Sequence, residues 1–245
     1  VGVCANEAFE LNIGFMNRQC HGRPFYRLKL ATSLDGRATA PDGQSQWITS
    51  EQSRADTHSW RARACAVVTG IGTVLADNPQ MTARIDDPKL PVQQPLRVIL
   101  DSHGRLPSHA KILDGQGGVC VLSGVAAPDW TSRLDTADFE WVRLPVQSSG
   151  RLSLEAVLDY LNHQPFNEVH IEAGPTLSGA WLEEGEVDEL LMYQSMAFLG
   201  AGQPAAELQH LKHLSERILF DRIACDGIGP DLRLRLRKSD NEEIK

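Results

Sequence analysis

A chain of 245 residues, 42% of them apolar, has the size and composition of one large globular domain or two small ones. Its formal net charge of −8 argues against a nucleic-acid-binding surface, and it contains no apolar run of the ~18–20 residues that span a bilayer. The five cysteines are scattered, with no CxxC pair and no secretory h-region. This pattern predicts a cytoplasmic protein without a zinc site of the finger or ribbon type.

The first 22 residues look separate from the rest of the chain. Ala8, Leu11 and Phe15 lie near helical spacing, and Gly22-Arg23-Pro24 ends that pattern. A short helix is marginal alone, so we expect either a docking element or the tail of another domain.

The stretch from Arg27 to Trp47 predicts a strand, a tight turn and a polar loop. Lys29 interrupts an apolar strand, and Ser33-Leu34-Asp35-Gly36 favours a tight turn. Such a strand and loop often line the mouth of a ligand cleft in α/β enzymes. An edge strand with a solvated loop would give the same pattern.

Strands and helices then alternate. The sequence Thr49-Ser50-Glu51-Gln52 has capping-box spacing, with Thr49 as N-cap, and predicts a helix that runs to about Arg63. Further predicted strands are 64–69, 96–100, 118–122, 139–144, 168–172 and 188–196. Predicted helices are a short one that ends at Pro79, one over 153–162, and one that starts at 173–176 with a Pro in its first turn. A Pro-rich loop covers 86–95.

The C-terminal segments 217–225 and 232–237 alternate polar and apolar residues, with Gly227 and Gly229 between them. Alternation is typical of antiparallel strands with one solvated face, and the tail from Ser239 should fray. The whole pattern predicts an α/β fold with a mostly parallel central sheet, antiparallel C-terminal strands and flanking helices.

Four polar or Gly-rich turns follow predicted strands, at 33–36, 70–73, 101–102 and 172–176. Ligands bind beyond the carboxyl ends of parallel strands, so we expect these turns to share one crevice. The last turn opens a helix whose N–H groups could bind an anion, although a plain strand-to-helix connection has the same sequence. Gly70-x-Gly72 is not an orthodox Rossmann fingerprint, because Leu75 takes the third glycine position.

Several side chains near these turns are candidates for ligand contacts. Arg61 and Arg84 could bind a phosphate, although most arginines are solvated surface residues. Glu172 ends an apolar strand, which suggests a ligand contact, whereas Asp77 could simply cap a turn. The histidines show no paired metal-binding spacing and read as structural or surface residues, among them His58, His103 and His170.

Five stretches occur in order and at compatible spacing: LKLATSLDGR, SQWITS, TGIGTVLADNPQMTAR, VILDS and IEAGPTLSGAWL. Together they resemble the reductase-domain family of the bifunctional riboflavin-biosynthesis protein RibD (also called RibG), which has a dihydrofolate-reductase-like fold. The resemblance covers 23 to about 237 and implies a reductase domain over 23–245. Residues 1–22 resemble the last helix of the family's deaminase domain. The zinc-deaminase signature, HxE with PCxxC, is absent, so we expect no deamination by this chain.

The resemblance implies NADPH-dependent reduction of 5-amino-6-(5-phosphoribosylamino)uracil to 5-amino-6-(5-phosphoribitylamino)uracil. The NADPH contacts that it implies are Ala31, Trp47, Thr73, Asp77, Ser102 and the helix start Gly174, Pro175, Thr176, Leu177, Ser178, Gly179 and Ala180. The substrate contacts that it implies are Ser45, Arg61, Met81, Arg84 and Glu172. Met81 replaces the Leu common in the family, a change that should keep the apolar surface.

In such a reaction the ribosyl ring opens before C1′ accepts a hydride, and the accepting atom needs a nearby proton or cation. Lys29 and Asp77 are the candidates for that catalytic role, and Lys29 could equally position the ribityl hydroxyls. The resemblance also implies a homodimer and an association with a deaminase domain or protein. Three alternatives remain open at this point: a pterin reductase on the same fold, a non-catalytic nucleotide-binding module and a protein-interaction fragment.

Overall fold

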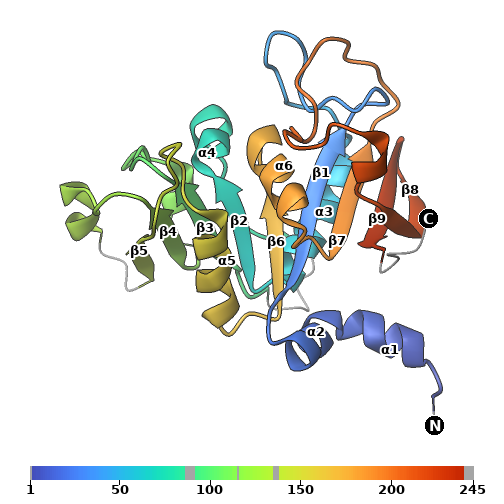
Figure 1. Cartoon of the computed structure of the whole chain (residues 1–245), viewed down its shortest axis with the longest axis horizontal. Helices are drawn as coiled ribbons and strands as arrows, with labels where there is room; N and C mark the ends of the chain where they lie inside the picture. Colours follow the sequence, from blue (N-terminus) through green and yellow to red (C-terminus); the bar gives the residue numbers. More distant parts are fainter. Residues whose placement is uncertain (1, 86–91, 115, 135–137, 240–245) are drawn as a thin grey trace. The chain divides into compact units, whose positions relative to one another are not determined.

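The computed structural model describes residues 2–85, 92–114, 116–134 and 138–239. Most of the predicted Pro-rich loop at 86–95 lies outside the described residues, as does the charged tail after Ser239. Figure 1 labels the helices and strands of the chain. The chain divides into two compact units, each assembled from separate stretches of sequence. The first comprises Val1–Tyr26, Arg61–Thr82 and Gln93–His170, and the second comprises Arg27–Trp60, Ala83–Val92 and Ile171–Lys245.

The described part of the first unit contains a run of parallel strands. In spatial order they are β5 (Phe139–Arg143), β4 (Val119–Ser123), β3 (Leu96–Asp101) and β2 (Ala66–Gly70). Strand β4 is buried along its whole length, which explains why its sequence VCVLS is nearly continuous in apolar residues rather than alternating. The helices are α1 (Ala5–Leu11), α2 (Ile13–His21), α4 (Ile71–Asp77) and α5 (Leu154–His163), with 3-10 turns η1 (Lys111–Leu113) and η2 (Asp129–Arg133).

The N-terminal segment forms two helices rather than the single predicted one. Helix α1 ends at Asn12, and α2 follows directly and ends at Gly22, which adopts the left-handed conformation at φ 71°. Gly14 of α2 lies so close to the backbone of Asn167 that an added Cβ would be 2.7 Å from its carbonyl oxygen. The segment therefore packs closely against the rest of the first unit.

The second unit contains both parallel and antiparallel strands. In spatial order they are β1 (Phe25–Thr32), β7 (Glu189–Gln194), β9 (Asp231–Lys238) and β8 (Phe220–Ile228). Strands β1 and β7 are parallel, whereas β9 is antiparallel to both of its neighbours. Its helices are α3 (Glu51–Arg63) and α6 (Pro175–Glu184), with η3 (Leu214–Glu216), and β6 (Glu168–Glu172) begins in the first unit and ends in the second. The predicted α/β fold class is confirmed.

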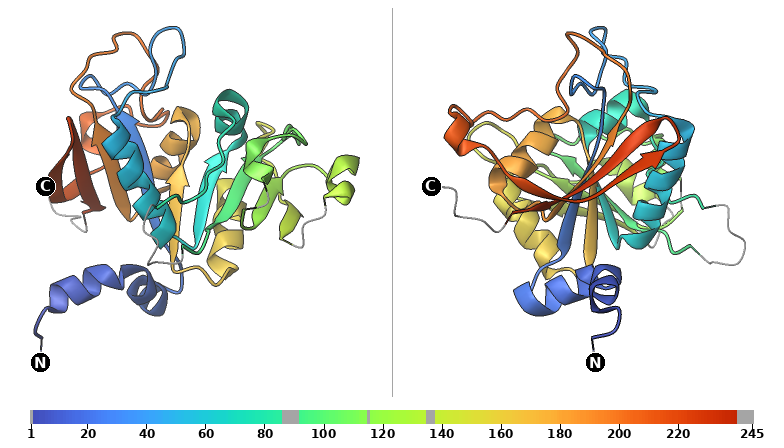
Figure 2. Two further views of the ribbon diagram at one scale, coloured as in Figure 1. Left: turned by 180° about the vertical axis from the view of Figure 1, so that it is seen from behind. Right: turned by 90° about the vertical axis from the view of Figure 1, so that its right-hand side faces the viewer.

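Helix α3 covers one face of β1 and β7 through polar and charged side chains; Figure 2, left, shows it (teal) along β1 (blue). Its buried residues are Ser53 and Thr57, neither of them apolar. On the sheet below, the strand register aligns Arg27 with Glu189 and Glu189 with Arg237. A charged layer thus takes the place of the usual apolar helix–sheet contact.

The arginines of β9 correct one prediction. Alternation in this segment predicted a solvated polar face, but the side chains of Arg233, Arg235 and Arg237 are only 19%, 18% and 24% exposed and form ion pairs with acidic residues of the same unit. The polar face of this strand faces the protein, because α3 brings few apolar side chains to it.

Two local boundaries also differ from prediction. Helix α3 begins at Glu51, and the Ser50 hydroxyl accepts a hydrogen bond from the Ser53 N–H at 3.3 Å, so Ser50 rather than Thr49 takes the capping position. Gly227 lies within β8, and the hairpin turn falls at Gly229 with φ 58°. None of the helices in the described part of the chain has the length and apolar character needed to cross a bilayer.

Candidate active site

In the first unit, α4 carries two of the predicted contacts. Thr73 and Asp77 are four residues apart and therefore share one face of the helix. Thr73 is half-buried and Asp77 is exposed. Asn78 then turns into the left-handed conformation before Pro79, which ends the helix as predicted.

Arg61 and Met81 are brought together in the same unit. Nη1 of Arg61 donates to the Thr82 carbonyl oxygen at 3.1 Å, and its Nη2 lies 4.0 Å from the Met81 sulfur. Met81 is buried and adopts φ 57°. The guanidinium is thus held at a fixed place by backbone and side chain of the segment after α4.

Ser102 follows β3 at the predicted turn. Its hydroxyl accepts a hydrogen bond from the Leu152 N–H at 3.0 Å. The adjacent Asp101 is buried and accepts from the Leu106 N–H at 2.8 Å. These contacts attach the turn to the segments that contain Leu106 and Leu152.

In the second unit, Lys29 and Ala31 lie on one face of β1, because side chains two apart in a strand point the same way. Both are half-buried, whereas Leu28 and Leu30 of the opposite face are buried. The loop after this strand presents Ser45, half-buried, and Trp47, which is 68% exposed. The guanidinium of Arg54 lies 4.3 Å from the centroid of the Trp47 ring.

The predicted tight turn at 33–36 is present and is joined to the loop after β7. The Gly36 N–H donates to the Ser33 carbonyl at 3.0 Å, with Gly36 at φ 72°. Asp35 accepts from the Ser33 hydroxyl and from the N–H groups of Leu199 (3.1 Å) and Gly200 (2.8 Å). The Ser33 hydroxyl, followed by the Leu199 N–H, lowers the pKa of Asp35 to about 2. The carboxylate therefore joins the two loops.

Arg84 contacts His58 of α3. Its backbone N–H donates to Nδ1 of the imidazole at 3.3 Å, and its Nη2 lies 3.0 Å from Nε2. A neutral imidazole accepts through only one of its ring nitrogens, so the tautomer decides which of these two contacts is a hydrogen bond. Both contacts hold Arg84 beside α3.

Glu172 ends β6 and is half-buried, and α6 follows with Gly174 as N-cap and Pro175 at its first position. Thr176 of the first turn donates to the Glu207 carboxylate at 2.8 Å. An added Cβ on Gly179 would lie 1.9 Å from the Glu207 carbonyl oxygen, so only glycine lets this loop pass. The predicted anion site at α6 therefore has an acidic neighbour.

Residues 24–240 match the RibD C-terminal domain family. The chain belongs to this family.

Relatives and solved structures agree. Riboflavin biosynthesis protein RibD of Escherichia coli (strain K12) is 36% identical over 250 residues, covering 96% of this chain and 65% of the relative. Its counterpart in Mycobacterium tuberculosis (strain ATCC 25618 / H37Rv) is 33% identical, covering 91% and 57%. The structure of Acinetobacter baumannii RibD, form 1, has a TM-score of 0.84 at 35% identity, covering 98% of this chain and 65% of that one. The chain thus spans less than two thirds of these relatives.

A more distant neighbour shares the fold alone. Saccharomyces cerevisiae riboflavin biosynthesis reductase Rib7 has a TM-score of 0.66 at 19% identity and covers 89% of this chain and 91% of that one. The family resemblance expected from the five sequence stretches is confirmed.

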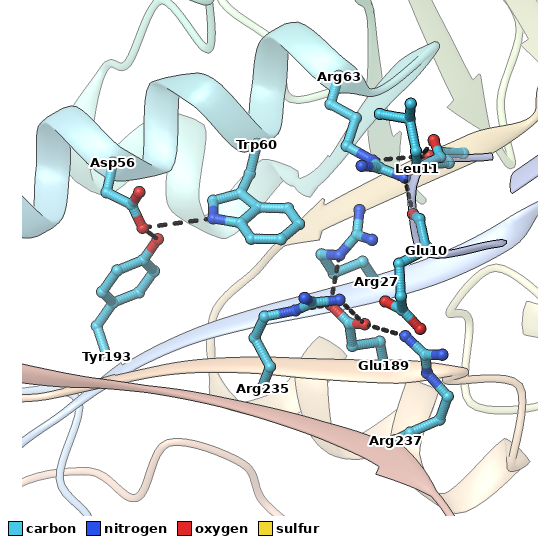
Figure 3. A network of polar contacts seen from close by, with 11 residues as sticks. Glu10, Leu11, Arg27, Asp56, Trp60, Arg63, Glu189, Tyr193, Arg235 and Arg237 are labelled. Carbon is cyan, nitrogen blue, oxygen red and sulfur yellow. Dashed lines mark hydrogen bonds and ion pairs between the residues drawn. The ribbon is translucent and has the colours of Figure 1, made fainter. Parts of the chain in front are cut away.

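In this RibD C-terminal domain, a polar network next to Lys29 was not predicted from the sequence. It consists of Asp56 and Trp60 on α3, Tyr193 on β7 and Arg233 on β9 (Figure 3 shows Asp56, Trp60 and Tyr193). His58, predicted to be a structural or surface residue, is half-buried and contacts Arg84. The alternating arginines of β9 indicate a strand with one charged face, but they do not indicate that α3 covers this face.

One tripeptide of this RibD C-terminal domain, His170-Ile171-Glu172, matches the HxE half of the zinc-deaminase pattern. It lies in β6, where His170 is fully buried. Among the described residues, no group of three or more His, Cys, Asp or Glu side chains is placed to hold a metal ion.

Proposed function

We propose that this chain reduces 5-amino-6-(5-phosphoribosylamino)uracil to 5-amino-6-(5-phosphoribitylamino)uracil with NADPH. The observation that carries the proposal is membership of the RibD C-terminal domain family over 24–240. A solved structure from Thermotoga maritima, whose description names a diaminohydroxyphosphoribosylaminopyrimidine deaminase/5-amino-6-(5-phosphoribosylamino)uracil reductase, adds support. It has a TM-score of 0.80 at 26% identity and covers 97% of this chain and 63% of that one.

The substrate is held, in this proposal, by Ser45, Arg61, Met81, Arg84 and Glu172. Arg84 binds the phosphate, because a guanidinium matches phosphate oxygens bidentately. Nη2 of Arg84 lies 3.0 Å from Nε2 of His58, so the imidazole holds the guanidinium beside α3 before substrate binds. Arg61 is already fixed by the Thr82 carbonyl, which reduces the ordering cost of a contact with substrate.

The cofactor is held by Ala31, Trp47, Thr73, Asp77, Ser102 and the α6 start from Gly174 to Ala180. The α6 start fits a phosphate group, because the N–H groups of a first helical turn lack intrahelical partners and carry the positive end of the helix dipole. The missing N–H of Pro175 at the first position costs little there. When bound, NADPH supplies the hydride that reduces C1′ of the substrate.

Lys29 and Asp77 are the two candidates for stabilising or protonating the atom that accepts the electron pair. Lys29 offers a half-buried cation on β1, and Asp77 offers an exposed carboxylate on α4. One of the two supplies or stabilises the proton as the open form of the ribosyl group is reduced. The protein otherwise orients the reactants and limits access of water.

We also propose the organisation of the longer protein. Residues 1–22 are the end of a deaminase domain, and 23–245 are the reductase domain. The chain acts in the cytoplasm as a homodimer, together with a deaminase domain or protein.

The deciding experiment is an assay of NADPH oxidation with freshly prepared deaminated pyrimidine substrate. We expect absorbance of NADPH to fall only when this substrate is present, with formation of the ribityl product. Turnover with a dihydropterin instead would favour the pterin reductase. Binding of NADPH without its oxidation would favour a non-catalytic nucleotide-binding module. The absence of both binding and turnover would favour a protein-interaction fragment.

A further inference from the structure

Lys29 lies beside the ring of Tyr193 on one face of the sheet in the second unit. The register pairs Lys29 with Leu191 and Ala31 with Tyr193, so Tyr193 is the diagonal neighbour of Lys29. Nζ of Lys29 is 5.9 Å from the centroid of the ring, within the range of a cation–π contact. Lys29 is half-buried and Tyr193 is fully buried. The ring therefore lies next to the ammonium group.

The hydroxyl of Tyr193 is anchored at the far end of the ring. It donates a hydrogen bond to Oδ2 of Asp56 at 2.5 Å, and Nε1 of Trp60 lies 3.4 Å from the same oxygen (Figure 3). Burial, and then the hydrogen bond to Asp56, raise the pKa of Tyr193 above its ordinary value. The phenol thus remains a neutral donor.

Arg233 in turn fixes Asp56. Its Nη1 lies 3.0 Å and 2.9 Å from the two carboxylate oxygens of Asp56, and its Nη2 lies 2.7 Å from Asp226 of β8. The register places Arg233 directly opposite Tyr193 on the neighbouring strand. The ring is therefore held from α3 and from β9 at once.

This arrangement is more elaborate than packing requires. A leucine or phenylalanine would fill the same space without a buried hydroxyl that needs an acceptor. The hydrogen bond fixes the hydroxyl end of the ring and β7 fixes the other end, so the position of the ring beside the neighbouring cation is set. The observable consequence lies at Lys29.

We propose that Tyr193, anchored by Asp56, is a positioning residue that sets the place and reactivity of the Lys29 ammonium. Its significance for catalysis rests on the proposed reductase function, in which Lys29 is a candidate cation. The geometry of the network itself does not depend on that function.

Labelling of lysines in the intact folded chain tests this proposal. Brief reductive methylation, quantified residue by residue by mass spectrometry, compares the wild type with Tyr193→Leu. Removal of the ring uncovers the amine and removes a contact that favours its charged form. We therefore expect labelling of Lys29 to rise at least twofold relative to Lys111, Lys212 and Lys238. A rise of less than twofold in a folded Tyr193→Leu variant overturns the proposal.

Matched variants separate this effect from a general loss of stability. Tyr26→Phe removes a hydrogen bond of the same kind, from a fully buried tyrosine hydroxyl to Oδ1 of Asn162 at 2.7 Å, and should leave labelling of Lys29 unchanged. Tyr193→Phe keeps the volume of the ring and removes the hydroxyl, and Asp56→Ala removes the acceptor, so each of these variants removes the anchor. Where the leucine variant does not fold, these two decide by the same twofold criterion.

The reductase assay adds a second readout. Tyr193→Leu should lower kcat by about tenfold while KM stays within about twofold, since Lys29 acts on developing charge rather than on binding. If the wild type shows no turnover but labelling of Lys29 still rises in Tyr193→Leu, the proposed function is rejected and the positioning role is kept. Wild-type turnover together with unchanged labelling would reject the positioning role and keep the function.

Discussion

Arg27 and Glu189 form a buried ion pair on neighbouring strands, with Nε and Oε1 2.9 Å apart and side chains 1% and 0% exposed. Arg235 and Arg237 of β9 donate to the other carboxylate oxygen at 2.8 Å and 2.7 Å. One carboxylate therefore forms ion pairs with three guanidinium groups (Figure 3). Trp60 of α3 completes the layer, with the guanidinium carbons of Arg27 and Arg235 4.5 Å and 5.2 Å from its ring.

Replacement of Glu189 by alanine should destabilise the protein strongly. Removal of one partner from a buried ion pair leaves the other charges uncompensated, at a cost of about 3–5 kcal/mol. The free energy of unfolding from urea denaturation measures this cost. Glu184→Ala, at an exposed position of α6, is the control and should change stability by no more than about 0.5 kcal/mol. Equal stabilities for the two variants would show that the layer contributes no net stability.

The same carboxylate predicts a pH dependence. Burial raises the pKa of Glu189, but Arg27 and Arg235 outweigh burial and lower it to about 2, from 4.5. Because the pKa of Glu189 is lower in the folded state than in the unfolded state, its charge contributes fully to the free energy of unfolding above the unfolded-state pKa. This contribution is lost as pH falls from about 4.5 through about 2. The contribution of the Glu189 charge is at most about 3 kcal/mol.

Urea titrations of wild type and Glu189→Gln between pH 2 and pH 7 would test this dependence. The glutamine variant keeps the shape but not the charge, so the gap in stability should be largest near neutral pH. It should shrink on acidification. A gap that stays constant down to pH 2 would show that charge at Glu189 does not contribute.

Local sequence signals predicted much of the fold. The strand at Glu168–Glu172 has the predicted bounds, and α6 begins at Pro175 because Gly174 and Pro175 are strong helix-start residues. The charged layer could not be predicted in this way. Its partners Arg27, Glu189 and Arg237 meet only through strand register, and the sequence does not state that register.

The residues of the candidate site also fall into those that local sequence predicts and those that meet only in the folded structure. Candidate residues adjacent in sequence to a turn, such as Ser102 and Thr176, are predicted from the turns or from the family motifs. Asp56 and Tyr193 are 137 residues apart, and neither belongs to a motif. Nothing in the sequence links them, whereas the structure joins them by one hydrogen bond.

Arg84→Ala tests the proposed phosphate contact. Loss of a charged hydrogen bond should weaken substrate binding by about 1.5–3 kcal/mol, which is roughly tenfold to a hundredfold in Kd. Calorimetric titration with substrate and with NADPH measures both affinities, and that for NADPH should be unchanged. Arg222→Ala, an exposed arginine of β8, should alter neither. An equal loss for substrate and NADPH would show that Arg84 does not select the phosphate of the substrate.

Asp77→Asn tests the candidate proton-handling residue of α4. Asparagine keeps the shape but can neither carry the charge nor take up the proton, so kcat should fall roughly a hundredfold or more, the range for general acid–base groups. KM should rise much less. Steady-state kinetics measure both, with Asp159→Asn on the exposed face of α5 as the control. Turnover at the wild-type rate would remove Asp77 from the chemistry.

Glu207→Gln tests the acidic neighbour of the α6 start. A carboxylate at 2.8 Å from the Thr176 hydroxyl places negative charge beside the helix end that should receive a cofactor phosphate. Glutamine keeps an oxygen for Thr176 and removes the charge, so NADPH should bind about twofold to fivefold more tightly, on the scale of helix-dipole effects. Because surface electrostatics are screened by salt, the gain should shrink at high ionic strength. Glu183→Gln, near the other end of α6, is the matched control, since Glu183 also contacts the segment after Glu207 through His210. An equal gain in both variants, or none in either, would place the cofactor phosphates away from the start of α6.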